Sequence, residues 1–404
     1  MNRRTPFPLW PLAFCFFQAA CANETARVSS IPRDSAGIVI VENDTDHNDV
    51  QCHVSAEPRL VIGEADGAPG YSFYRMFDGT ILEDGRIAVV NQGSSEIRVY
   101  DASGTFLHAF GRAGGGPGEF QSVFQLLPGP GDTLIVGDYS PWRYSYFTAD
   151  GTYVRAVVPQ PVDLNSPRSH GVLADGTFII AQTCCLTREP EFRERSLHVV
   201  RADAEGAHVD SLHVYPHGLL GRLGRPQLRL MGFPIFESFS DVAIGHDRWV
   251  GGYGAKPEIE VRAPDGRLLT LIRWHDNDRT VTPDEVDEYR RAHVAVSTSP
   301  AERELLEAEV SDERPVADFF PAFTSIEIAR SGEIWVRLFD RPLQPRPPQW
   351  LVFQADGRFL CHATTPAGFG RFGLWEIGTD YLLGNGRDAL DVERVLVYNW
   401  SRPG

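Results

Sequence analysis

One short pattern recurs six times along the chain: a turn pair followed directly by a short apolar strand. The turn pairs start at Asp84, Gly131, Asp175, His246, Ser331 and Thr379, and the strands are 87–90, 134–137, 178–181, 249–252, 334–337 and 381–384. In five units a second turn pair follows an alternating strand, at 103–104, 150–151, 205–206, 265–266 and 356–357. Acidic-Gly and Ser-Gly pairs suit tight hairpins because glycine adopts a positive φ without steric penalty. The pattern predicts repeated antiparallel meanders.

The sixth unit lacks the second turn pair, and the start of the chain offers the missing strand. Residues 60–63 followed by 68–71 (LVIG, APGY) mirror residues 109–111 followed by 116–119 (AFG, GPGE). We therefore expect residues 58–63 to pair with 393–399 and to close a ring. Four-stranded units spaced roughly 45 residues apart, with such a closure, predict an all-β fold, a six-bladed β-propeller without free strand edges.

Two features of this architecture stay open in the sequence. Residues 37–43 (GIVIVEN) read as an extra strand, which we expect on the closing blade. A seventh blade could lie in 212–245 or in 276–330, although neither stretch holds two turn-bounded strands in phase.

The loop 111–120 (GRAGGGPGEF) resembles the loop of NHL-type repeats. Together with the start at 34–43 (DSAGIVIVEN), the whole pattern resembles the bacterial six-bladed propeller lipoproteins of largely unknown function. This resemblance implies the architecture and leaves the activity open. The other units lack a clean NHL signature, so it does not imply RNA binding or a ligase scaffold.

The N-terminus resembles an export signal. Arg3 and Arg4 precede an apolar run at 7–17, which small residues follow up to Cys21. Cys21 resembles the acylated cysteine of a bacterial lipobox, although Gln18 stands where an aliphatic residue is usual. We expect residues 1–21 to be the signal, 22–36 a tether and 37–404 the propeller. The protein is then an exported monomer, anchored by lipid in the periplasm or outer membrane, with simple secretion as the alternative.

Four cysteines remain outside the signal. An oxidising compartment permits a disulfide, and Cys52 with Cys361 is the first choice because both should lie near the ring closure. Unpaired buried thiols remain the alternative, and Cys184 and Cys185 are a vicinal pair. No CxxC or HExxH motif indicates a metal. The formal net charge of −16 argues against a nucleic-acid partner, because phosphate binding needs basic clusters.

The long insertions are predicted on one side of the ring. In a meander of strands a to d, the a–b and c–d turns lie on one side, and the b–c and d–a links lie on the other. The stretches 183–196, 212–234, 276–323 and 340–349 are all b–c or d–a links. Within the third, helix signals predict helices at 283–296 and 300–310, a helical insertion at about 280–312. Loops on a rigid scaffold are where binding commonly occurs, so we expect a ligand or envelope-protein site on this side.

Candidate ligand-binding residues lie where strands a and b would meet a central funnel. They are Arg75, Asp78, Asn91, Asp138, Arg143, His170, Gln182, Glu237 (expected in the first strand of the fourth unit), Tyr253 and Arg337. Mixed carboxylate, His and Arg side chains can serve acid–base chemistry or simply bond one another. Three functions stay open: binding without catalysis, a lactonase-like hydrolase or lyase, and a structural envelope protein with a filled channel. Under the second, Glu237, Asn91 and Asp138 are the calcium-ligand candidates, and no cofactor is otherwise indicated.

Overall fold

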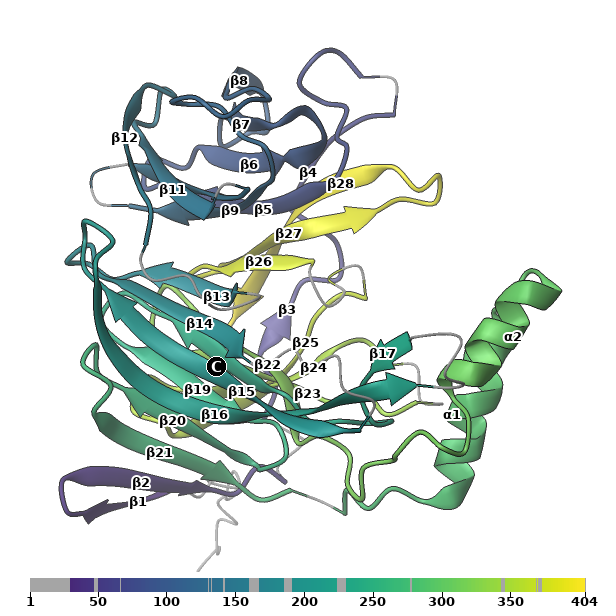
Figure 1. Ribbon diagram of the computed structural model, residues 1–404. Coiled ribbons are helices and arrows are strands. Elements are labelled where there is room, and N and C mark those ends of the chain that lie inside the picture. Colours follow the sequence, from purple (N-terminus) through teal and green to yellow (C-terminus); the bar gives the residue numbers. More distant parts are fainter. Residues whose placement is uncertain are drawn as a thin grey trace, which may run out of the picture.

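The computed structural model describes residues 30–403 except 47–49, 66, 130, 132, 141, 160–166, 185–190, 224–229, 277, 343–345, 368 and 370–372. In this part of the chain the strands form six sheets, which follow one another in chain order (Figure 1). The fold is all-β and propeller-like. Neither 212–245 nor 276–330 adds a further sheet among the described residues.

The sheets are numbered here in chain order, and each begins with its innermost strand. Sheet 1 holds β5 (Met76–Ile81), β6 (Ile87–Asn91), β7 (Glu96–Tyr100) and β8 (Phe106–Phe110). Sheet 2 holds β9 (Val123–Pro128), β10 (Leu134–Tyr139), β11 (Trp142–Phe147) and β12 (Tyr153–Val157). Sheet 3 holds β13 (Pro167–Val172), β14 (Phe178–Cys184), β15 (Arg193–Ala202), β16 (His208–Leu223) and β17 (Leu230–Gly232).

Sheet 4 holds β18 (Ser240–Ile244), β19 (Trp249–Tyr253), β20 (Glu258–Arg262) and β21 (Leu268–Trp274), to which β2 (Ile38–Asn43) and β1 (Ser30–Ser35) are added. Sheet 5 holds β22 (Phe323–Ile328), β23 (Ile334–Leu338), β24 (Gln349–Phe353) and β25 (Phe359–Thr364). Sheet 6 holds β26 (Leu374–Ile377), β27 (Tyr381–Arg387), β28 (Glu393–Ser401), β3 (His53–Val54) and β4 (Leu60–Ile62).

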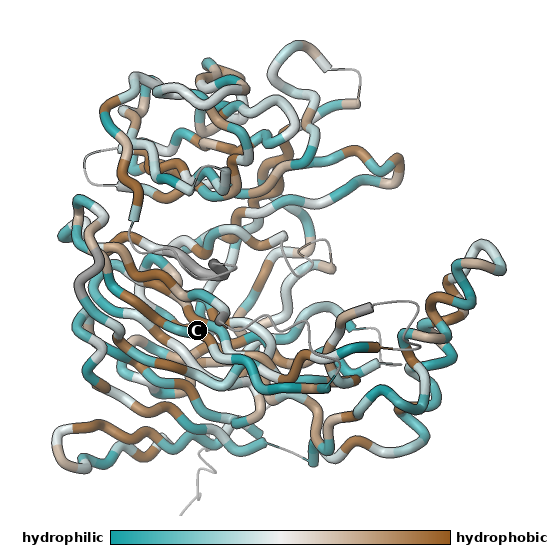
Figure 2. The backbone as a smooth tube through the Cα atoms, viewed as in Figure 1, coloured by the Kyte–Doolittle hydropathy of each residue, from teal (hydrophilic) through white to brown (hydrophobic). Residues whose placement is uncertain are grey.

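The predicted turn pairs form the hairpins of these sheets. At the first of them Gly85 has φ +88° and its N–H donates to the Leu82 carbonyl at 2.9 Å. Asp84 Oδ1 accepts the N–H of Arg86 at 3.0 Å, which fixes the turn through the aspartate side chain. The most hydrophobic stretches lie inside the strands, and the turns are mostly hydrophilic (Figure 2).

The ring closure is the one that the sequence predicts. β4 pairs with β28 in antiparallel register, with Val61 opposite Leu396. Each pair of neighbouring sheets shares an apolar cluster, and one of these joins the last sheet to the first through Leu383 and Val395 against Ile87 and Val89. Burial of such clusters between successive sheets is the main favourable term that holds the sheets together.

The extra N-terminal strand lies elsewhere than expected. β2 runs parallel to β21 at the outer edge of sheet 4, and not on the closing sheet. The pattern of 37–43 identifies a strand but carries no information about its neighbour, which is fixed by distant contacts. Asn43 Oδ1 accepts the N–H of Phe359 at 2.8 Å, and Asn43 Nδ2 donates to the Gly357 carbonyl at 3.0 Å. Residues 30–35, which lie within the expected tether, form β1, which pairs with β2.

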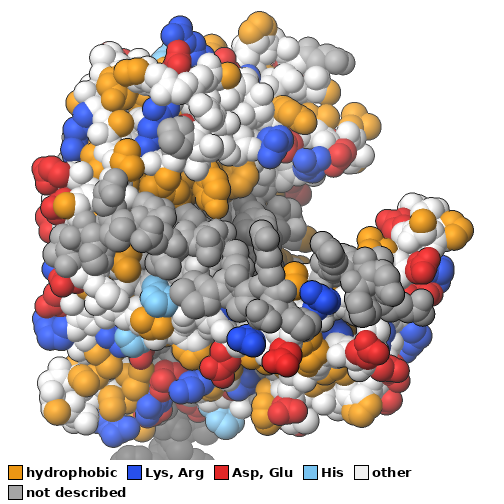
Figure 3. Space-filling view, viewed as in Figure 1, with side chains coloured by type: hydrophobic (Ala, Val, Ile, Leu, Met, Phe, Trp, Pro, Cys, Tyr) orange, Lys and Arg blue, Asp and Glu red, His pale blue; other side chains and the backbone are white. Residues whose placement is uncertain are grey.

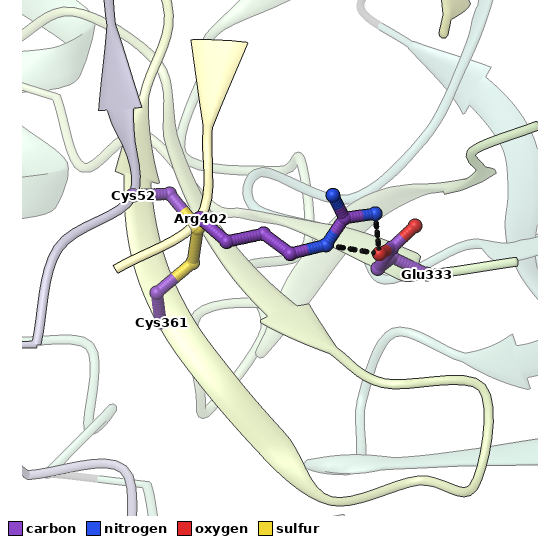
Figure 4. The surroundings of a disulfide bond; sticks show 4 residues. All are labelled: Cys52, Glu333, Cys361 and Arg402. Atoms are coloured by element: carbon purple, nitrogen blue, oxygen red, sulfur yellow. Dashed lines mark hydrogen bonds and ion pairs between the residues drawn. A yellow bond between two sulfur atoms is a disulfide. The ribbon is translucent and has the colours of Figure 1, made fainter. Parts of the chain in front are cut away.

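Residues 30–62, the N-terminal strap, therefore pass along the outer edges of sheets 4, 5 and 6 in turn. Cys52 forms a disulfide with Cys361 of β25, the pairing predicted from the sequence, and both residues are buried. Nearby, Arg402 beyond β28 donates from Nε to Glu333 Oε1 of sheet 5 at 2.7 Å (Figure 4). Cys52 of the N-terminal strap and Arg402 after the last strand are thus both fastened to sheet 5.

The helical insertion follows β21. α1 (Pro283–Ala295) and α2 (Pro300–Glu309) match the predicted helices to within one residue. Thr282 and Glu285 form the expected capping box, in which each side chain accepts the other residue's backbone N–H. The buried Val286 packs with Phe236 and Phe320, whereas α2 has no buried residue.

The side with the b–c and d–a links, here the insertion side, carries the elaborations. Residues 212–223, expected to be part of an insertion, instead prolong β16, and β17 pairs with its end. This β16–β17 arm and the two helices project on the same side of the molecule (Figure 1).

Candidate functional site

Four carboxylates lie on the innermost strands. They are Asp78 on β5, Asp241 on β18, Glu327 on β22 and Glu376 on β26. Asp78 Oδ2 accepts the Leu126 N–H of the next sheet at 2.8 Å. Asp241 Oδ2 accepts the Ile326 N–H of sheet 5, the sheet that follows its own, also at 2.8 Å. These carboxylates thus bind neighbouring sheets together near the centre of the ring.

Two of these carboxyl groups have pKa values near neutrality. Burial raises the pKa of Glu327 to about 8, and the neighbouring Asp241 and Asp78 raise it further by repulsion. Burial also raises the pKa of Asp78 to about 7, although the N–H groups of Leu126 and Gly79 stabilise its charge. Both residues are intermediate in exposure. A carboxyl group that titrates near pH 7 can donate or accept a proton under physiological conditions.

The charge of the fourth carboxylate, Glu376, is compensated by an arginine. Arg330 Nε lies 2.7 Å from Glu376 Oε1, and the hydroxyl of Thr80 donates to Glu376 Oε2 at 2.5 Å. Glu376 therefore forms a structural ion pair. The pKa of Glu327, in contrast, is set by burial and by two carboxylates, and no cationic group lowers it.

A second polar group lies at the insertion side of sheets 3 and 4. Burial raises the pKa of Glu237, and burial together with Glu237 and Glu194 raises the pKa of Tyr253. Glu237 precedes β18 and is not in the first strand of its sheet as expected, because β18 begins only at Ser240. The buried guanidinium of Arg195 attracts the Glu237 carboxylate and stacks on Phe233 at 4.8 Å.

Of the predicted residues, the structure thus brings Glu237 and Tyr253 together. Sequence reasoning missed their neighbour Arg195 and the inner-strand carboxylates Asp241, Glu327 and Glu376. A signal was present, since each of these three carboxylates interrupts a short apolar strand. The strands are SDVAI, FTSIEI and LWEI.

Three other predicted residues hold loops. Asn91 Oδ1 accepts the Tyr74 N–H at 2.9 Å, and Asp138 accepts the N–H groups of Gln121 and Ser122 at 3.0 and 2.7 Å. Each of these side chains lies at or next to the end of the second strand of its sheet and fixes the segment that enters the first strand. Arg143 lies 3.5 Å from Asp138 and donates to the Gly115 carbonyl at 3.0 Å.

The remaining predicted residues are dispersed. Arg75 is exposed before β5, and Arg337 pairs with Asp340 at 2.7 Å. Gln182 lies on β14, two residues before its end, and is fully buried. His170 belongs to β13, but its side chain lies outside the described residues, as do Cys21, Cys185 and the side chain of Cys184.

The calcium-ligand candidates do not form a common site. Asn91 and Asp138 are committed to different loops, and Glu237 belongs to the group around Arg195. In the described part of the chain, no three His, Cys, Asp or Glu residues are placed to hold a metal ion. The residues present therefore do not fit the predicted calcium site.

A hollow of about 410 Å³ lies apart from both polar groups, where the chain leaves sheet 4. Trp274, Asp276, Arg279 and Phe319 line it. Arg279 bonds Asp276 and donates to the carbonyls of Phe320 and Ala255, so it is fully engaged in holding the link itself. We regard the inner carboxylates and the insertion side as the stronger candidates.

Comparison with known proteins supports the fold. No protein-family model matches the chain, and no curated protein matches it. A member of the DUF4221 family from Bacteroides vulgatus is similar in structure with a TM-score of 0.51 at 12% identity, covering 87% of this chain and 99% of that chain. A Bacteroides fragilis protein described as exported gives 0.48 at 11% identity over 91% and 100% of the two chains. A gluconolactonase of Xanthomonas campestris gives 0.40 at 12% identity over 87% and 100%.

None of the helices among the described residues is long and apolar enough to cross a membrane. The likeness to the Bacteroides vulgatus protein concerns the fold alone. The chain has an all-β, propeller-like fold.

Proposed function

We propose that this protein is an exported six-bladed propeller, anchored by a lipid at Cys21, that binds a small ligand or an envelope protein on its insertion side as a monomer. The observation that carries this proposal is the one-sided placement of the insertions. The turns of the other side are tight, whereas the β16–β17 arm and the helices α1 and α2 extend from the insertion side. Neutral variation in loop length would spread such elaborations over both sides.

The shape of the insertion side fits a binding role. The molecule is hollowed between the β27–β28 hairpin and α2 (Figure 3). Glu237, Tyr253 and Arg195 supply polar groups on this side, with Phe233 as an apolar neighbour. A concave surface with few polar groups among apolar ones is typical of ligand sites.

Removing the helical insertion tests the proposal. Thr280 pairs with Phe319, so the two ends of the insertion are adjacent and a short Gly-Ser linker can replace 283–316. A library of metabolites and an envelope extract are screened against the parent by thermal shift and pull-down, and the hits are then measured on the trimmed protein. We expect binding to weaken at least about tenfold. The control is Ala102→Glu, which lies in a tight turn on the other side of the ring and should leave binding unchanged. The proposal would be refuted if the hits bound the trimmed protein with the affinity of the parent.

The second candidate is a hydrolase or lyase with a central site, and a specific observation favours it. Asp78 and Glu327 have pKa values of about 7 and 8, a range suited to general acid–base catalysis. Glu327→Gln should then abolish turnover of a lactone or ester substrate while the protein stays folded. A parent protein that turns over no member of a lactone and ester panel would exclude this candidate.

A further inference from the structure

Sheets 2 and 3 face each other across a seam. Tyr144 and Tyr146 of β11 pack there against Phe178 and Ile180 of β14. Side chains alternate between the two faces of a strand, so residues two apart share a face. Trp142 therefore continues the sheet 2 face toward the insertion side, and it packs against the same cluster. By the same alternation, Gln182 continues the face of sheet 3.

The sheet 2 side of the seam ends in three aromatic rings, here the aromatic wall: Phe124, Tyr139 and Trp142. Phe124 and Trp142 are stacked with ring centres 5.9 Å apart, and Tyr139 lies 6.0 Å from Trp142 in an edge-on contact. Gly137 leaves room for this arrangement, because a Cβ there would lie 3.2 Å from the Phe124 ring. Tyr139 is 45% exposed, so the wall reaches the surface on the insertion side.

The sheet 3 side of the seam is polar. Gln182 is paired in register with His198 of β15, and Cys184 with Ser196, so Gln182, His198 and Ser196 share one face. His198 Nε2 and Ser196 Oγ are hydrogen-bonded at 2.8 Å. Gln182 is fully buried, and in the described part of the chain neither its amide oxygen nor its amide nitrogen has a hydrogen-bond partner.

This unused amide differs from its counterparts. Gln182 is the fifth residue of the second strand of its sheet, and the fifth residues in sheets 1 and 2 are Asn91 and Asp138, each of which accepts backbone N–H from an entering segment. Buried polar groups in native proteins are nearly always bonded, so an amide with two unused atoms requires an explanation. By strand alternation, Gln182 lies on the face of sheet 3 that is turned toward sheet 2, and the aromatic wall lies on the opposite side of the seam. Aromatic surface opposite a few polar groups is typical of small-molecule sites.

We propose that the seam between sheets 2 and 3 binds a flat aromatic small molecule whose edge carries an N–H donor beside a carbonyl acceptor. The ring packs against the aromatic wall, and the edge bonds the amide of Gln182, which offers one acceptor and one donor in return. This inference rests on the proposed binding function and names a ligand class for the part of the insertion side at sheets 2 and 3, apart from the group around Glu237.

Three probes separate the two elements of the proposed ligand. Benzamide has both the ring and the amide edge, acetophenone lacks the N–H, and acetamide lacks the ring. Ligand-observed NMR titrations of the full mature chain should show saturable binding of benzamide and at least about tenfold weaker binding of each other probe. Gln182→Met keeps the side-chain length, and it should weaken benzamide binding at least about tenfold. Equal binding of benzamide to the parent and to Gln182→Met, or no binding to the parent, would overturn the proposal.

Thermal unfolding separates a ligand-binding amide from a structural one. Gln182→Met should leave the unfolding midpoint unchanged or raise it, because the change removes a buried amide that no protein group bonds. Asn91→Leu is the matched control, and it should lower the midpoint because its amide holds the entering segment. A Gln182→Met midpoint lowered as much as that of Asn91→Leu would overturn the proposal. Loss of binding on removal of residues 283–316 tests the proposed function separately, so the two failures are distinguishable.

Discussion

The disulfide offers the clearest test of how the N-terminal strap is held. Cys52 and Cys361 are 309 residues apart, and both are buried with Cα atoms 5.5 Å apart. In the chain-entropy model, a cross-link over so long a loop destabilises the unfolded state by about 5–6 kcal/mol, and measured values generally fall below this limit. We expect the double variant Cys52→Ala/Cys361→Ala to lose about 3–5 kcal/mol of unfolding free energy.

The assay is reversible urea unfolding of the mature protein under oxidising conditions. The parent in a thiol reductant is the control, and it should lose a similar amount because the same cross-link is removed. Hydrogen exchange should rise most in residues 30–54 and least in 60–62, because β4 remains paired with β28. A double variant within about 1 kcal/mol of the parent would refute the reasoning, since the cross-link would then not restrict the unfolded chain.

Three further predictions concern charge and backbone. The free energy of unfolding should fall as the pH rises from about 5 to 8, because folded Glu327 keeps a proton that the unfolded chain releases. Glu327 alone contributes up to about 1.4 kcal/mol per pH unit. In urea unfolding, Glu327→Gln should therefore show a flatter pH profile than the parent. Asp138→Ala should lower the unfolding free energy by about 3–5 kcal/mol in the same assay, since it leaves two loop N–H groups and Arg143 without their partner. Gly111→Ala should lower the thermal midpoint and reduce the free energy of unfolding by about 2–3 kcal/mol. The reason is that φ is +88° and the added Cβ would lie 2.4 Å from the Phe120 ring.

Each of these predictions has a control or a contrary outcome. A Glu327→Gln variant whose stability changes with pH as steeply as that of the parent would contradict the raised pKa of Glu327. Asp138→Asn keeps an acceptor for the loop and should cost less than Asp138→Ala. Gly131→Ala introduces the same methyl group at φ +63° with no atom within 4 Å, so a loss equal to that of Gly111→Ala would remove the steric explanation.

The sheets were predictable from the sequence because their signals are local. A turn pair such as Asp84-Gly85 and the strand after it lie within a few residues of each other, and the missing outer strand could be found by comparing units. The position of β2 was not predictable in this way. Its neighbour β21 lies more than 200 residues away, and the contacts that fix it involve Asn43 with Gly357 and Phe359.

The candidate site was predicted less well than the fold, for a related reason. Position alone identified Asn91 and Asp138 as ends of strands near the centre, but a position does not reveal what a side chain bonds. Both accept N–H groups from loops, which no sequence pattern indicated. Glu327 interrupts an apolar strand, but its raised pKa could not be foreseen because it depends on burial and on residues of two other sheets.

The N-terminal strap has a consequence for the order of folding. It contains the first described residues of the chain, yet its partners β21, Cys361 and β28 are all synthesised more than 200 residues later. Sheets 1 to 3 can form while the chain is still being synthesised, but the strap can complete its contacts only when almost the whole sequence is present. Contacts between segments so distant in sequence form slowly, so closing the molecule should be the late step of its maturation.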